Sequence, residues 1–246
     1  SKRETAEPQQ AKTGTRMKVR VNRSTANEGN RFYYEGIRKE KGMAEILLKV
    51  QESLANIPDE ISLEHFSRDE QLAYWLNLFN VAMINQVIEV YPQRSLKKLL
   101  VGRKSIMDDK ILEVGGVQLS LNDIQYTILP ENYDNNPLVM YGLYYGIVGG
   151  PNIRKRAYNG ENVWRYLEAN AREFINSNRG TYARDESVFK ASSLYERNAV
   201  WFGDLKKDLK PHLLQYIQGQ EKYKLQSASS IRPDIDDWTV TDLYGT

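Results

Sequence analysis

The chain has 246 residues, and its 34 Lys and Arg residues nearly balance its 32 Asp and Glu residues, so the net charge of +2 gives no global field of the kind that marks nucleic-acid or membrane-surface binders. It contains no cysteine, which excludes disulfides, thiol nucleophiles and Cys-ligated zinc, and its two histidines, His65 and His212, are too few for a His-rich metal site. No apolar run approaches the ~18 residues that a membrane-spanning helix needs. We therefore expect no metal, no cofactor and no transmembrane segment, and nucleic acid is an unfavoured partner.

The N-terminal stretch is polar. Residues 1–28 are rich in Lys, Arg, Gln, Thr and Asn, which predicts a flexible, polar and basic arm. We expect an ordered domain over residues 29–217. Its first helix is predicted within residues 41–54, where apolar residues recur at helical spacing.

The stretch 67–91 predicts the longest helix of the chain, around which the rest is organised. Ser67 and Glu70 form a capping-box pattern at its start, and Pro92 supplies the stop, because the residue before a proline is disfavoured in the α region. Apolar residues lie on nearly every side of this helix. We therefore expect it to be buried on most of its faces.

A polar stripe interrupts this apolar helix. Tyr74, Asn77 and Asn85 fall within about one quadrant of the helical wheel together with Glu70, and Asn80 lies just beside them. Buried amides must find hydrogen-bond partners. The stripe therefore either braces the fold through backbone groups, which is the plainer interpretation, or lines a polar cleft.

The elements after Pro92 are predicted from turn residues, caps and periodicity. In chain order we expect one or two helical turns over 95–101, two short strands around a turn at Gly115 and Gly116, a helix over 121–129 that Ser120 and Asp123 cap and Pro130 ends, a polar loop over 131–137, a helix over 161–176, a strand over 187–191, and helices over 193–202 and 205–217.

The stretch 138–148 is the one continuous apolar and aromatic run, and its length and Tyr and Val content favour a buried strand. It ends at two glycines, followed by the basic residues Arg154, Lys155 and Arg156. Such a loop can bind an anion, but its spacing fits neither a phosphate loop nor a dinucleotide fingerprint. A tight turn with a solvated basic edge is the plainer interpretation.

The C-terminal stretch 218–246 begins polar and ends with several apolar residues. Ile235, Trp238, Val240, Leu243 and Tyr244 make the end of the chain too apolar for a free tail. We expect this extension to pack back on the domain.

The assembled pattern resembles the DUF547 family from about Leu63 to Tyr216. The resemblance is carried by DEQLAYWLNLFNVAMINQVIEVYP at 69–92 and GGVQLSLNDIQYTIL at 115–129, with the stretches 139–152 and 161–175 following in the family's order. It implies a single α+β domain, predominantly helical, with a small β-sheet around the long buried central helix. Because bacterial members often carry export signals, it also implies a periplasmic or secreted location.

The chain departs from the family at chemically important positions. Asn85 stands where members commonly carry a histidine, and residues 145–151 replace a stretch that commonly contains two cysteines. Thiol or imidazole chemistry at these positions is therefore lost. The resemblance carries over the scaffold and brings no settled activity with it.

The first functional hypothesis is a non-catalytic or degenerate binding or accessory module, which recognises a polar ligand or a protein partner. Tyrosine, asparagine and a single arginine suit a glycan, a peptide or a carboxylate, through stacking and amide hydrogen bonds. The expected ligand-binding residues are Tyr74, Asn77, Asn80, Asn85, Tyr145, Asn152 and Arg154.

Two other hypotheses stay open. A carboxylate-based hydrolase or transferase acting on a glycan or peptide would use Glu70 and Asp123, although both are also explained as capping residues. A binder of anionic surfaces would use the basic arm and the basic residues 154–156. The nearly balanced charge of the chain counts against the latter.

Overall fold

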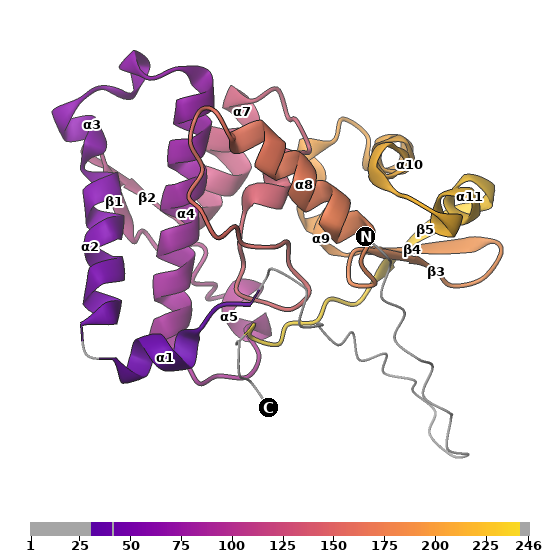
Figure 1. Cartoon of the computed structure of the whole chain (residues 1–246), viewed down its shortest axis with the longest axis horizontal. Coiled ribbons are helices and arrows are strands. Elements are labelled where there is room, and N and C mark those ends of the chain that lie inside the picture. The colour runs from indigo at the N-terminus through magenta and orange to yellow at the C-terminus, as the bar shows by residue number, and fades with distance from the viewer. Residues whose placement is uncertain (1–30, 41, 242–246) are drawn as a thin grey trace.

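The computed structural model describes residues 31–40 and 42–241, so the predicted arm at 1–28 and the apolar residues after 241 lie outside the described residues (Figure 1). The described residues are 52% helical and 11% strand, which confirms the predicted α+β class with a helical majority. No helix among the described residues is long and apolar enough to cross a bilayer.

The described helices and strands follow one another in this order. The α-helices are α1 Tyr34–Lys39, α2 Met43–Ala55, α3 Ile57–Glu60, α4 Arg68–Val90, α5 Lys97–Leu100, α6 Leu121–Asp123, α7 Leu129–Asn132, α8 Val163–Ile175, α9 Leu194–Arg197, α10 Leu205–Tyr216 and α11 Gln220–Ser227. The 3-10 turns are η1 Leu63–His65, η3 Val139–Gly142 and η4 Ala199–Trp201, and η2 Ile124–Ile128 is a π-helix. The strands are β1 Leu112–Val114, β2 Val117–Leu119, β3 Thr181–Ala183, β4 Val188–Ser192 and β5 Ser230–Asp234.

Helix α4 is the central element, as predicted. The Ser67 side chain accepts from the Glu70 backbone N–H while the Glu70 carboxylate accepts from the Ser67 N–H, so the capping box is complete. Most of the helix is buried, with Leu72, Leu76, Leu78, Phe79, Ala82, Met83 and Val87 fully inaccessible. Helices α1, α2 and α8 all contact it (Figure 1).

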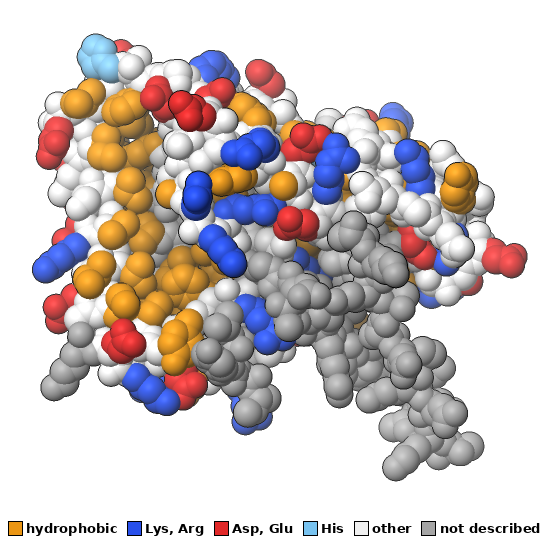
Figure 2. All heavy atoms as spheres, in the orientation of Figure 1, with side chains coloured by type: hydrophobic (Ala, Val, Ile, Leu, Met, Phe, Trp, Pro, Cys, Tyr) orange, Lys and Arg blue, Asp and Glu red, His pale blue; other side chains and the backbone are white. Residues whose placement is uncertain are grey.

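Helix α2 covers one side of α4 but is itself poorly buried. Ala55 is its one buried residue, whereas Ile46 is 55% exposed and Val50 is 43% exposed. Figure 2 shows a column of hydrophobic atoms that runs along α2 beside α4. The helix packs along α4 and leaves apolar surface open on this face of the molecule.

Two small sheets form. Strands β1 and β2 are an antiparallel hairpin, and Gly115 and Gly116 at its turn have φ of +55° and +74°, a conformation that glycine adopts without strain. The second sheet has the order β3-β4-β5, with β3 antiparallel and β5 parallel to β4. Both the hairpin and the strand predicted at 187–191 are confirmed.

The buried strand predicted over 138–148 is wrong. The segment is buried, but it forms the 3-10 turn η3 and then an extended stretch whose one ladder contact is a bridge between Ile147 and Val240. Gly142 lies so close to α4 and α8 that a Cβ there would come within 2.9 Å of Leu76 and 2.6 Å of Leu167. A hydrophobic run predicts burial, but here helices rather than neighbouring strands cover the segment.

The predicted end of the helix at Pro130 is also wrong. Ser120 and Asp123 cap the start as expected, but the helix continues through the π-helical turn η2 and ends at Asn132. A proline normally ends a helix because its ring clashes with the carbonyl four residues earlier. We attribute the continuation to the wider π-helical turn, which shifts the carbonyls that precede Pro130.

The end of the described chain crosses the middle of the molecule. After β5, the backbone groups of residues 238, 239 and 241 hydrogen-bond to Leu96, Val148 and Gly146. Trp238 and Val240 pack against the core, but Ile235 is 84% exposed, so its predicted burial is wrong. Ile235 lies between the end of β5 and the buried Asp236.

Candidate functional site

Asn77 and Asn80 each form two hydrogen bonds with the backbone of a loop. Asn77 donates to the Tyr158 carbonyl at 2.9 Å and accepts from the Tyr158 N–H at 3.0 Å. Asn80 donates to the Gly142 carbonyl at 2.9 Å and accepts from the Tyr144 N–H at 2.8 Å. A side-chain amide with one donor and one acceptor thus replaces the strand partner that these loops lack. This is the bracing arrangement that the sequence left open.

The other two residues of the polar stripe lie elsewhere on α4. Asn85 donates to the Leu47 carbonyl at 3.3 Å and to the Gln51 side chain at 2.8 Å, which ties α2 to α4. Tyr74 is buried edge-on against Trp75, and its hydroxyl has no hydrogen-bond partner among the described residues. Burial raises the Tyr74 pKa, so the phenol stays protonated.

In the predicted basic loop, the charge of Arg154 is paired with a glutamate of the same chain. Asn152 and Arg154 both donate to the Glu173 carboxylate on α8, at 2.6 Å and 3.1 Å, and Arg179 donates to the Asn152 side-chain oxygen. The structure therefore brings Asn152 and Arg154 together, but it pairs them with an acid. In this arrangement Arg154 holds the loop to α8 and is not free to bind an external anion.

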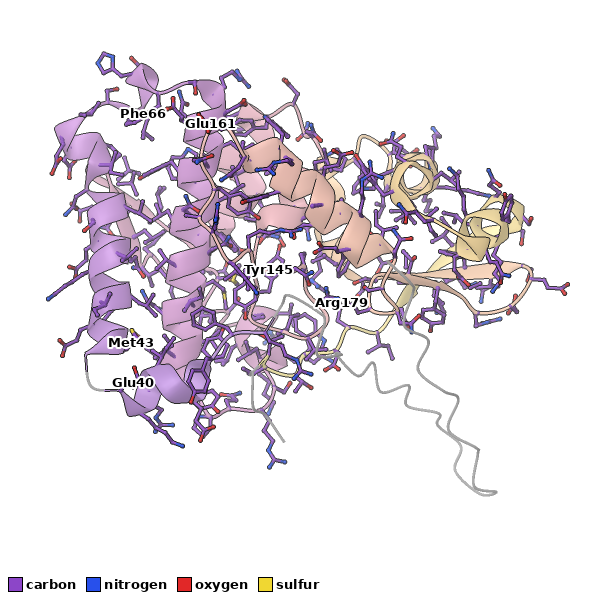
Figure 3. The ribbon with its side chains drawn as sticks, in the orientation of Figure 1. Glu40, Met43, Phe66, Tyr145, Glu161 and Arg179 are labelled. Atoms are coloured by element: carbon purple, nitrogen blue, oxygen red, sulfur yellow. The ribbon has the colours of Figure 1, made fainter. Side chains whose placement is uncertain are left out.

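Figure 3 shows Tyr145 near the centre of the molecule. This residue lines a small recess of about 40 Å³. That volume admits a few water molecules or one small polar group of a larger ligand. The lining comes from five parts of the chain, namely Leu100, Val101 and Met107, then Asn122, Gln125 and Tyr126, then Tyr145 and Ile147, then Arg197, and finally Trp238.

Two polar groups of this recess are not used by the protein. Gln125 donates to the Asn198 side chain at 2.8 Å, but its Oε1 is buried and accepts no hydrogen bond from the described residues. The Tyr145 hydroxyl lies beside Asn198 without a hydrogen bond of good geometry. Burial raises the Tyr145 pKa, so this hydroxyl is a proton donor at neutral pH.

The C-terminal segment closes one side of the recess. Arg197 forms an ion pair with Asp236, whose side chain is 1% exposed, and the guanidinium lies 4.7 Å from the centre of the Trp238 ring. The positive charge in the recess wall is thus already matched by a buried acid. A neutral polar group fits this environment better than a charged one.

The two candidate catalytic acids serve as helix caps. Hydrogen bonds from the Ser67 side chain and backbone lower the pKa of the exposed Glu70. The Asp123 pKa is lowered first by its contact with Lys110, at 2.5 Å, and then by the Ser120 backbone. A general acid needs a raised pKa, so neither carboxylate is suited to that role. Within the described residues, no group of three His, Asp or Glu side chains could hold a metal ion.

Sequence reasoning missed most of the recess. Gln125 and Tyr126 lie in the π-helical turn η2, which no periodicity rule detects, although π-helical turns often occur at functional sites. Arg197 and Trp238 are distant from Tyr145 in sequence, and no motif connects them. The available signal was the position of Tyr145, which stands where the family commonly carries a cysteine.

The fold and the recess define an α+β protein with a mainly helical core, whose central helix braces its loops by side-chain amides. Residues 63–175 match the model of the family described as protein of unknown function, DUF547. This match supports the resemblance over those residues, and it ends with α8 rather than near Tyr216. No curated protein and no solved structure matches the chain.

Proposed function

We propose that this chain is a non-catalytic binding or accessory module, a degenerate member of the DUF547 family that holds a small polar group in the Tyr145 recess. The observation that carries the proposal is the pair of unused polar groups there. The Gln125 Oε1 acceptor and the protonated Tyr145 hydroxyl are both buried without a hydrogen-bond partner among the described residues. A bound polar group would supply the missing hydrogen bonds.

The recess suggests the chemistry of its ligand. Gln125 Oε1 needs a donor, and the Tyr145 hydroxyl offers one, so an amide or hydroxyl group of the ligand would satisfy both. The ion pair between Arg197 and Asp236 leaves no unmatched charge at the wall. We therefore propose a neutral amide or hydroxyl tip on a peptide or small metabolite. No observation favours the carboxylate hydrolase, because its two acids are occupied as caps.

The test is a thermal-unfolding screen with dipeptides, small amides, polyols and carboxylates, comparing wild type with Tyr145→Phe. A ligand at 100 times its Kd adds about 2.7 kcal/mol, which corresponds to roughly 5–10 °C for a chain of this size. Tyr145→Phe should leave the unliganded Tm unchanged, because the hydroxyl makes no good hydrogen bond, and should reduce the ligand-induced shift.

Tyr133→Phe is the matched control, because it deletes a tyrosine hydroxyl that donates to the Arg68 carbonyl, away from the recess. It should lower the Tm slightly and leave the ligand-induced shift intact. The proposal is wrong if no compound shifts wild type, or if the shift survives in Tyr145→Phe.

The family resemblance also supports a proposal about location. We place the protein in the periplasm or outside the cell, since bacterial members of the family often carry export signals. Fractionation of the native host with an antibody against this chain tests the proposal. Recovery in the cytoplasmic fraction alone would contradict it.

A further inference from the structure

A second hollow lies apart from the Tyr145 recess and shares no lining residue with it. It has a volume of about 390 Å³, within the roughly 300–1,000 Å³ typical of small-molecule sites. Helix α10 forms one side, and the segments 136–138 and 201–203 form the other. Its lining residues are Asn136, Pro137, Leu138, Trp201, Phe202, Gly203, Asp208, His212, Gln215 and Tyr216.

His212 forms part of the lining as a neutral imidazole. It is 8% exposed, its ring stacks on Tyr141 at 5.8 Å, and Phe202 and Tyr216 pack around it. Burial lowers its pKa to about 4, so the ring is uncharged at neutral pH. The Tyr141 hydroxyl donates to the Tyr195 hydroxyl at 3.1 Å and lies 2.8 Å from His212 Nε2.

The tautomer of His212 is assigned from these contacts. Because the single Tyr141 hydroxyl proton is directed to Tyr195, we assign the proton of the imidazole to Nε2, which donates to the Tyr141 oxygen. Nδ1 then carries a lone pair. It accepts no hydrogen bond from the described residues, so an acceptor is available on a ring that lines the hollow.

Trp201 supplies the complementary group. Its side chain is 1% exposed, and its buried Nε1–H has no acceptor among the described residues. Buried donors of native proteins are almost always paired with protein, water or ligand atoms. Trp201 is among the residues that line the hollow, and an acceptor bound there is one way to pair its buried Nε1–H.

The remaining lining is aromatic, apolar and nearly uncharged. Phe202, Tyr216 and Pro137 provide apolar walls, while Gln215 and Asn136 add amides. Asp208 is the one acidic side chain in the lining, and it already accepts from the Asp204 N–H at 2.7 Å. No lysine or arginine lines the hollow, which disfavours an anionic ligand. No serine, threonine or cysteine lies there to act as a nucleophile.

We propose that this hollow binds a neutral saccharide. The Trp201 Nε1–H donates to a ring or hydroxyl oxygen, His212 Nδ1 accepts from a sugar hydroxyl, and the C–H face of the sugar packs on Phe202 and Tyr216. Sugars offer donors, acceptors and an apolar face together, which is the combination that this lining presents. The site lies outside residues 63–175 apart from the 136–138 turn, so it is an addition to the family's matched region.

The experiment is saturation-transfer NMR of the whole chain with neutral trisaccharides built from glucose, mannose or N-acetylglucosamine, followed by affinity measurement for any binder. Trp201→Phe removes the N–H but keeps an aromatic ring, and Gln215→Ala changes an exposed residue at the rim. Each should weaken binding, with about a tenfold loss expected for Trp201→Phe.

Trp164→Phe is the matched control, because its Nε1–H donates to Asp69 at 2.7 Å, far in sequence from this hollow. It should leave sugar affinity unchanged, as should Tyr145→Phe, which tests the other recess. If no trisaccharide binds at millimolar concentration, the proposal is overturned. It is also overturned if Gln215→Ala and Trp201→Phe, checked for native circular dichroism, bind as tightly as wild type.

Discussion

Asparagine side chains supply hydrogen bonds to loop backbone groups that a neighbouring strand would otherwise supply. The amides of Asn77 and Asn80 each hold both backbone groups of a loop segment, and Asn170 donates to the carbonyls of Tyr141 and Asn152. The sequence showed that amides on α4 needed partners, and it favoured bracing. It could not name those partners, because they come from loops 60 to 80 positions later in the chain.

Asn80→Ala should destabilise the fold by about 3 kcal/mol, because it leaves the Gly142 carbonyl and the Tyr144 N–H buried without partners. Urea denaturation followed by circular dichroism measures the change. The control is Asn132→Ala, which removes an exposed bond to the Ile128 carbonyl and should change stability by less than about 0.5 kcal/mol. Equal effects of the two substitutions would contradict the bracing role.

His212 should make stability depend on pH. Its folded pKa of about 4 lies below the unfolded value of 6.5, so the unfolded chain binds a proton that the folded chain rejects as the pH falls. The folded state keeps its full stability above pH 6.5 and loses about 2 kcal/mol between pH 7 and pH 5 from this group.

The measurement is urea denaturation at several pH values for wild type and His212→Gln. The difference between the two pH profiles isolates the histidine from the carboxylates that also titrate. A difference that does not change between pH 7 and pH 5 would show that His212 titrates normally in the folded protein.

At the scale of elements, helix starts were predictable and helix continuations were not. The capping boxes at Ser67 and Ser120 are local patterns of four residues, so they can be read directly. The π-helical turn at 124–128 depends on what surrounds it, and Pro130 misled the prediction. The apolar run at 138–148 predicted burial correctly, but it did not predict the backbone conformation. A segment covered by helices and a segment covered by strands need the same apolar residues.

Ser67→Ala should cost about 1 kcal/mol, because the Glu70 N–H loses its side-chain acceptor at the start of the central helix. Thermal and urea unfolding both measure this loss. Ser62→Ala is the control, since Ser62 caps only a three-residue 3-10 turn through a long 3.4 Å contact. A loss at Ser62 as large as that at Ser67 would argue against a special role for the α4 cap.

At the scale of the whole molecule, the C-terminal segment joins the helical part to the second sheet. Strand β5 pairs with β4, Asp236 pairs with Arg197, and Trp238 forms a wall of the Tyr145 recess. The sequence indicated that this segment was too apolar to be free. It could not indicate a parallel pairing with β4, because parallel strands need a long crossover and give no local turn signal.

Asp236→Ala should destabilise the protein by about 3–5 kcal/mol, because it strands the Arg197 charge in a largely buried site. It should also loosen the Trp238 wall, which a red shift of tryptophan emission would report. Asp237→Ala is the matched control, since that carboxylate accepts only from the nearby Thr239 N–H. If both substitutions gave the same small effect, the ion pair would not be holding the segment.

Tyr34, Tyr144 and Thr241 join their hydroxyls inside the core, and the Phe32 N–H donates to the Thr241 carbonyl. The first and last stretches of the described chain are therefore joined by hydrogen bonds. On the ribosome, α1 emerges early and must wait until residue 241 has been made before its buried tyrosine can find both neighbours. Until then the nascent chain exposes an aromatic surface at α1 and an open recess at Tyr145, the kind of transiently exposed apolar surface that makes unfinished chains prone to aggregate.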